Sequence, residues 1–129
     1  MTSINLSGIQ SIVVPLTIQV GDEVRVVHDV NNKYQQQEYA LMVVHEEGVV
    51  GYIPCLNTIK KYIKKAEEDN DLRAYKNQRE RYAITDLIRS NIISDLFRNH
   101  TEVIGKIGRV QLDDDQEKVL SVTVSLDYM

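Results

Sequence analysis

Residues 28 to 65 contain side chains of the types that bind nucleic acids. Asn32 and Tyr34 lie in a polar segment between two valine-rich runs, and Tyr52 follows in the sequence GVVGYIP. A tyrosine ring can stack on a base, and asparagine can hydrogen-bond a base edge or a terminal hydroxyl. Lysine ammonium groups attract phosphates, and four of them follow closely: Lys60, Lys61, Lys64 and Lys65.

Each of these side chains also has a structural interpretation. Tyr34 could pack on the surface of the fold, and Tyr52 could pack in the core beneath its own strand. The lysines could simply form the solvated face of a helix. Residue type alone leaves both interpretations open at every one of these positions.

No catalytic or metal-binding signature accompanies them. His28, His45 and His100 lack the spacing of metal ligands, and no cysteine pair supports them. The acidic run at 113–117 lacks the spacing of an EF-hand loop, so it predicts a solvated turn. The sequence contains no P-loop, no GxSxG and no GxGxxG. We therefore expect neither an enzyme nor a bound cofactor or metal ion.

Charge is distributed unevenly along the chain, whose net charge is −4. Residues 1–54 carry two basic and six acidic side chains, and residues 83–129 carry five and eight. Residues 55–82, in contrast, carry eight basic and five acidic side chains. A basic segment within an acidic chain can provide a local anion-binding surface even though the whole protein is acidic.

The elements that must position these residues begin with short strands, which alternation and apolar runs predict in the first half. Of these runs, the one at 39–45 is nearly continuous in apolar residues and predicts a strand covered on both faces. Pro54 would end the last strand because it lacks a ladder donor. The four predicted strands are LTIQV at 16–20, EVRVVH at 23–28, YALMVVH at 39–45 and VVGYI at 49–53.

The apolar pattern changes to the helical period after Pro54. A stripe at i, i+3, i+4 and i+7 predicts an amphipathic helix that Asn57 or Thr58 could cap. Asn70 or Asp71 could cap a second helical stretch that continues to about residue 99, as one bent helix or two shorter ones. The stripe of the first helix is Ile59, Tyr62, Ile63 and Ala66.

The last 29 residues return to strand, with a turn at Asp113-Asp114-Asp115. The run KVLSVTVSL predicts a strand that buries Leu120, Val122, Val124 and Leu126 on one face. Strands, then helices, then a hairpin indicate the α+β class, and about six short strands would remove their edges by curling into a small, strongly bent antiparallel barrel.

Length and composition place the chain among globular proteins. Its 129 residues fit one domain, and 43% of them are hydrophobic and 26% charged. No apolar run approaches the length that spans a bilayer, and the N-terminus lacks the pattern of a secretory signal. The lone Cys55 cannot form an internal disulfide, so we expect a small buried side chain in a cytoplasmic protein.

The segment from Gly21 to about residue 65 resembles the HIRAN domain. That family has a Gly-Asp before a strand, a hydrophobic pair with an acidic group, an Asn-Pro-Tyr-Asp motif, an Ala-Ile-x-Val strand and a closing Gly-Tyr-hydrophobic-Pro. The matching residues are Asp29 at the acidic position, Asn32 and Tyr34 in the motif, Ala40 and Val43 in the strand, and Gly51 to Pro54 in the closing motif.

The chain departs from the family pattern at several points. Lys33 replaces the proline and Gln35 replaces the aspartate of the Asn-Pro-Tyr-Asp motif. The segment 35–39 is about two residues longer than the family's loop, and the helical block at 70–99 looks inserted. The replaced aspartate belongs to the part of the family fold that contacts DNA, so Gln35 alters one of those contacts.

The resemblance implies one HIRAN-like domain over residues 1–129, a barrel similar to SH3 and OB folds with a helical insertion at about 57–100. It also implies a non-catalytic module that binds single-stranded or damaged DNA ends. The residues implied to bind are Asn32, Tyr34, Tyr52, Lys60, Lys61 and Lys64.

A protein-interaction module is the alternative function. The helices at 70–99 carry more apolar side chains than one short helix needs to cover a small barrel, so they could instead join two copies in a homodimer. The side chains concerned are Leu87, Ile88, Ile92, Ile93, Leu96 and Phe97.

Overall fold

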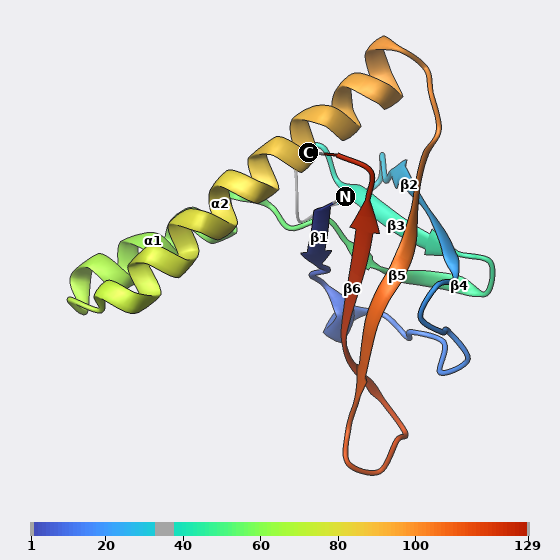
Figure 1. Cartoon of the computed structure of the whole chain (residues 1–129), viewed down its shortest axis with the longest axis horizontal. Coiled ribbons are helices and arrows are strands. Elements are labelled where there is room, and N and C mark those ends of the chain that lie inside the picture. Colours follow the sequence, from blue (N-terminus) through green and yellow to red (C-terminus); the bar gives the residue numbers. More distant parts are fainter. Residues whose placement is uncertain (1, 33–37, 129) are drawn as a thin grey trace.

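A computed structural model describes residues 2–32 and 38–128 of the chain. Six strands, two α-helices and two short helical turns make up this part of the fold (Figure 1). The 3-10 turn Ile9–Ser11 follows the first strand, and the π-helical turn Ser94–Arg98 extends the second helix. The main elements are β1 (Thr2–Asn5), β2 (Glu23–His28), β3 (Leu41–His45), β4 (Gly48–Tyr52), α1 (Leu56–Glu68), α2 (Leu72–Ile93), β5 (Val103–Leu112) and β6 (Val119–Leu126).

The strands form one antiparallel sheet in the order β1-β6-β5-β2-β3-β4. The sheet curls until its two ends meet just beyond β1. There the amide of Ser7 donates to the carbonyl of Tyr52 at 2.8 Å, and the amide of Tyr52 donates to the carbonyl of Ser7 at 2.9 Å. The α+β class and the bent antiparallel sheet are thus confirmed, in the form of a curled half-barrel.

The concave face of the sheet holds the core, and the second half of α2 covers it. Ile88 and Ile92 are fully buried there, together with strand residues such as Leu41 and Val43. On β6, Val122, Val124 and Leu126 are buried as predicted, but Leu120 is 48% exposed and Val119 is buried instead. The pairing of β5 with β6 shifts register between Gln111 and Leu112, and at this shift the side chains of β6 change the face of the sheet to which they point.

The other half of α2 leaves the sheet. Residues 72–82 of α2 lie against α1, and this helical pair, which we call the arm, projects away from the strands (Figure 1). Asp71 caps α2 by accepting the amide of Ala74 at 3.0 Å, which selects one of the two predicted capping residues. The second helical stretch is one helix ending in a π turn, so the alternative of two shorter helices is wrong.

Two predictions in the first half are wrong. Residues 16–20 form no strand: the amide of Gln19 bonds to the Asp22 carboxylate at 2.9 Å, and Leu16 and Val20 are exposed. The run at 39–45 is covered fully on one face only, because Met42 and Val44 are half-buried while their neighbours are buried. Strand β1, which the sequence patterns did not indicate, pairs with β6 instead.

No helix in the described part of the chain is long and apolar enough to span a membrane.

Candidate nucleic-acid interface

Asp29, Asn32 and Tyr52 meet in one hydrogen-bonded cluster where β2 runs into the β2–β3 connection. The Tyr52 hydroxyl donates to Asp29 Oδ2 at 3.0 Å, and Asn32 Nδ2 donates to the same oxygen at 3.4 Å. The amide of Asn32 also donates to the carbonyl of Asp29 at 3.3 Å. Fold closure therefore brings together three residues that the sequence-based resemblance singled out, although Tyr52 lies 20 residues after Asn32.

Tyr52 is held on two sides. Its ring lies against Gly8, where an added Cβ would come within 3.1 Å of the Tyr52 Cδ2. Burial raises the pKa of its hydroxyl, and the bond to the Asp29 carboxylate raises the pKa further, so the hydroxyl stays a proton donor. Tyr52 thus serves to fix Asp29, while Tyr34 lies outside the described residues.

The predicted lysines lie on the arm and not beside Asn32. Lys60, Lys61 and Lys64 are all exposed on α1, which leads away from the sheet (Figure 1). Lys60 Nζ lies 5.9 Å from the centre of the Tyr82 ring on α2, a cation–π contact that ties it to the arm. Lys61 and Lys64 belong to α1, whereas the Asp29 cluster belongs to β4 and the β2–β3 connection, so a binding site that combines them stays a prediction.

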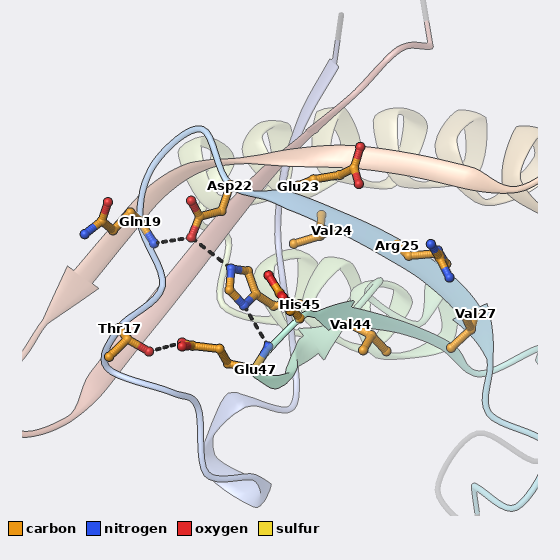
Figure 2. A pocket seen from close by; sticks show the side chains of 11 residues that line it. Thr17, Gln19, Asp22, Glu23, Val24, Arg25, Val27, Val44, His45 and Glu47 are labelled. Atoms are coloured by element: carbon orange, nitrogen blue, oxygen red, sulfur yellow. Dashed lines mark hydrogen bonds and ion pairs between the residues drawn. The ribbon is translucent and has the colours of Figure 1, made fainter.

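A pocket of about 680 Å³ opens beside β2 and β3, and four of the five charged side chains in its lining are acidic (Figure 2). His45 stands at its floor, donating from Nε2 to Asp22 Oδ2 at 2.8 Å and accepting the amide of Glu47 on Nδ1 at 3.1 Å. These bonds fix a neutral ring with the proton on Nε2. The charged lining residues are Asp22, Glu23, Arg25, Glu46 and Glu47, a composition that repels polyanions.

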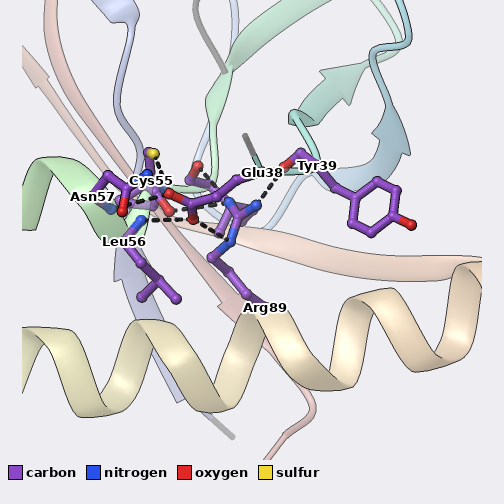
Figure 3. A network of polar contacts seen from close by, with 8 residues as sticks. Glu38, Tyr39, Cys55, Leu56, Asn57 and Arg89 are labelled. Atoms are coloured by element: carbon purple, nitrogen blue, oxygen red, sulfur yellow. Dashed lines mark hydrogen bonds and ion pairs between the residues drawn. The ribbon is translucent and has the colours of Figure 1, made fainter. Parts of the chain in front are cut away.

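Glu38 and Arg89 form a buried network that joins the β2–β3 connection to the base of the arm (Figure 3). Arg89 Nε lies 3.5 Å from Glu38 Oε1, and the same guanidinium donates to the carbonyls of Tyr39, Ile53 and Pro54. The network thus connects α2 to the segment that precedes β3 and to the segment that follows β4.

The Glu38 carboxylate also caps helix α1. It accepts the amides of Leu56 and Asn57, each at 3.0 Å, and the Cys55 thiol at 2.7 Å. Neither predicted cap, Asn57 or Thr58, performs this role, because Cys55 is the capping position. Sequence reasoning missed Glu38, because a cap supplied from 18 residues upstream leaves no local pattern.

Burial and these hydrogen bonds act in opposite directions on the pKa of Glu38, but burial and Glu38 act in the same direction on the pKa of Cys55. Burial alone would raise the pKa of Glu38, but the bonds from Cys55, Asn57 and Leu56 and the Arg89 charge hold it below its ordinary value of 4.5. Burial raises the pKa of the Cys55 thiol, and Glu38 raises it further. Cys55 is therefore a protonated donor in a structural network, and it is half-buried where we expected full burial.

The described residues hold no group of three or more histidine, cysteine, aspartate or glutamate side chains that could bind a metal ion. In the acidic run, Asp113 Oδ1 accepts the amides of Glu117 at 2.8 Å and Lys118 at 3.2 Å, which makes it part of the hairpin turn. His28, His45 and His100 lie at the ends of β2, β3 and the π turn, as their structural interpretation predicted.

Comparison of the chain with protein-family models, with curated proteins and with solved structures found no match in any of the three.

Proposed function

We propose that this protein is a non-catalytic nucleic-acid-binding module of the HIRAN type that takes single-stranded or damaged DNA ends. The observation that carries the proposal is the Asp29–Asn32–Tyr52 cluster. It fixes Asn32, whose amide group is a base-reading group, two positions before Tyr34 in the sequence. In the sequence, Asn32 and Tyr34 match two positions of the DNA-contacting motif of the family that the chain resembles.

Charge supports the same function through the arm. The basic segment 55–82 forms most of a projecting helical pair, so its lysines are accessible to a phosphate backbone. The acidic pocket beside β2 would repel the same backbone, and we therefore expect modest affinity with the strand kept away from that pocket.

Titration of labelled single-stranded and duplex oligonucleotides tests the proposal. The protein should bind the single strand more tightly, and Tyr34→Ala should cost about 1–3 kcal/mol of binding free energy if the ring stacks on a base. Tyr62→Ala, an exposed tyrosine on α1, is the matched control and should have little effect. Absence of any binding at low salt would reject the function.

Self-association is the second candidate function, and exposed apolar side chains on α2 are the observation that favours it. Leu72, Ile84 and Leu87 on α2 are exposed, the first of them to 82%. Ile88 and Ile92 were also predicted to belong to a partner surface, but they are buried in the core of the same chain. The exposed remainder is a small apolar surface, which favours at most a weak homodimer.

Light scattering over a range of concentrations decides between a monomer and a homodimer. If α2 joins two copies, Leu87→Glu should shift the mass toward the monomer, whereas Leu120→Glu on β6, equally apolar and exposed, should not. A mass that stays monomeric at the highest concentration of the parent protein would remove this candidate.

A further inference from the structure

Three aromatic rings from separate elements meet at the end of β2. The His28 ring centre lies 5.3 Å from that of Tyr39 and 5.1 Å from that of Phe97. The Tyr39 and Phe97 centres are 4.6 Å apart with the ring planes tilted by 31°. The His28 ring is nearly perpendicular to both of the other rings, at 80° and 82°, which is a favourable edge-to-face arrangement.

These rings are not part of the core. Tyr39 is 47% exposed and Phe97, the chain's one phenylalanine, is 38% exposed, and neither belongs to the buried cluster of described residues. Burying the exposed part of each ring would be favourable, because apolar surface removed from water contributes hydrophobic free energy. Both rings are therefore accessible to a partner, and covering them would bury more apolar surface.

The backbone beneath each ring is fixed. The carbonyl of Tyr39 accepts a hydrogen bond from Arg89, and Phe97 lies in the π-helical turn that ends α2. Turns of this kind occur frequently at functional sites. A ring pair that is already held in place loses little conformational entropy when a flat ligand stacks on it.

The rings lie at the opposite end of β2 from the acidic residues Asp22 and Glu23. His28 directly precedes Asp29, so the rings lie at the same end of β2 as the Asp29–Asn32–Tyr52 cluster, whereas the acidic Asp22 and Glu23 lie at the start of that strand. Arg98, exposed and next to Phe97, adds a positive charge for a phosphate. Because Tyr52 pairs with Met42 and His28 pairs with Leu41, the cluster and the rings border opposite faces of the sheet.

We propose that Tyr39 and Phe97 form a stacking platform for an unpaired base of a single-stranded nucleic acid, with His28 as the residue that positions both rings. This inference rests on the proposed function and adds a binding site to it. Any base can occupy such a platform, since every base has a flat π face, so the site selects for unpaired bases and not for a sequence.

An oligonucleotide with bases and the same backbone with abasic sites separate stacking from phosphate attraction. The parent protein should prefer the base-containing strand by about 5-fold to 150-fold, the range that one stacked base gives. Tyr39→Leu and Phe97→Leu should each remove most of that preference. The salt dependence of binding should stay unchanged, because no phosphate contact is lost.

Matched variants keep the test independent of folding. Tyr62→Leu, a tyrosine of equal exposure (49%) on the arm, should keep the base preference, and Phe97→Tyr should restore what Phe97→Leu loses. Thermal unfolding checks each variant. If Phe97→Leu does not fold, fluorescence of a 2-aminopurine base in the oligonucleotide tests the platform instead. Binding to the parent should quench this fluorescence, and binding to Tyr39→Leu should not.

The outcomes separate this inference from the function on which it rests. If the parent binds single strands but shows no base preference, or if folded variants keep that preference, the platform is rejected and the proposed function stands. If the parent binds neither strand, both are rejected. A preference lost in both leucine variants and kept in Tyr62→Leu establishes the platform.

Discussion

Leu6 packs directly onto the Cα of Gly51. A Cβ built at Gly51 would come within 2.7 Å of the Leu6 Cβ and 3.3 Å of the Ser7 carbonyl oxygen. This contact lies beside the paired hydrogen bonds of Ser7 and Tyr52 that bring the two ends of the sheet together. The glycine of the Gly-Tyr-Ile-Pro motif thus has a physical reason: only a residue without a side chain lets the chain after β1 approach β4.

Gly51→Ala should therefore destabilise the fold. The added methyl group forces Leu6 or the Ser7 backbone to move, and overpacking of this kind costs about 1–3 kcal/mol beyond the strain of φ 152°. Gly21→Ala is the control, since Gly21 also has a positive φ of 92° but no atom within 4 Å of an added Cβ. Urea unfolding of both variants should show the larger loss at Gly51, and equal losses would mean that strain alone matters.

Glu38→Gln should weaken the joint between the β2–β3 connection and the arm. Removing one member of a buried ion pair costs about 3–5 kcal/mol, and we expect the lower end because Arg89 keeps its carbonyl acceptors. Chemical unfolding at neutral pH measures the loss. Glu102→Gln, which breaks the exposed pair with Arg25, should change stability by less than about 1 kcal/mol.

The contribution of Glu38 should also depend on pH. The pKa of this carboxyl is lowered in the folded protein, so the charged form stabilises the fold above the ordinary pKa of 4.5 and the benefit is lost as the pH falls through the lower folded value. The difference in unfolding free energy between parent and Glu38→Gln should accordingly narrow below pH 4.5. A constant difference down to strongly acidic pH would contradict this assignment.

Asp22 should titrate below its ordinary pKa of 3.8, because the Gln19 amide, and then His45, donate hydrogen bonds to its carboxylate. NMR titration of the Asp22 side chain in His45→Leu should show its pKa moving upward. The move should be incomplete, since the Gln19 amide remains. The signals of residues 113–118, in a different hairpin, serve as the internal reference, and an unmoved Asp22 titration would refute the coupling.

Replacing Lys61 and Lys64 together by glutamine should flatten the salt dependence of oligonucleotide binding. Each lost contact with a single strand lowers the slope of log K against log salt by about 0.7, so two contacts give about 1.4. The preference for bases over abasic sites should survive, since phosphate contacts carry little base information. Lys106→Gln with Lys118→Gln, exposed lysines on β5 and in the β5–β6 hairpin, should leave the slope unchanged.

The sequence by itself determined most of the local structure. Alternation places Val24 and Val26 on the buried face of β2, and the Asp71 cap marks the start of α2. These features depend on neighbours within a few residues, which is the distance over which side-chain periodicity and capping act. The α+β class followed from the order of the predicted elements.

Tertiary structure decided everything that depends on which distant segments meet. The alternating residues 16–20 form no strand because β1 pairs with β6 and the amide of Gln19 bonds to Asp22 within the loop. The carboxylate of Glu38 caps α1 because chain closure places it there, and no local pattern announces such a partner. The lysines of α1 lie on the arm because the apolar stripe of α1 packs on α2. An amphipathic stripe shows that a face must be buried, but the element that buries it is settled only by the fold as a whole.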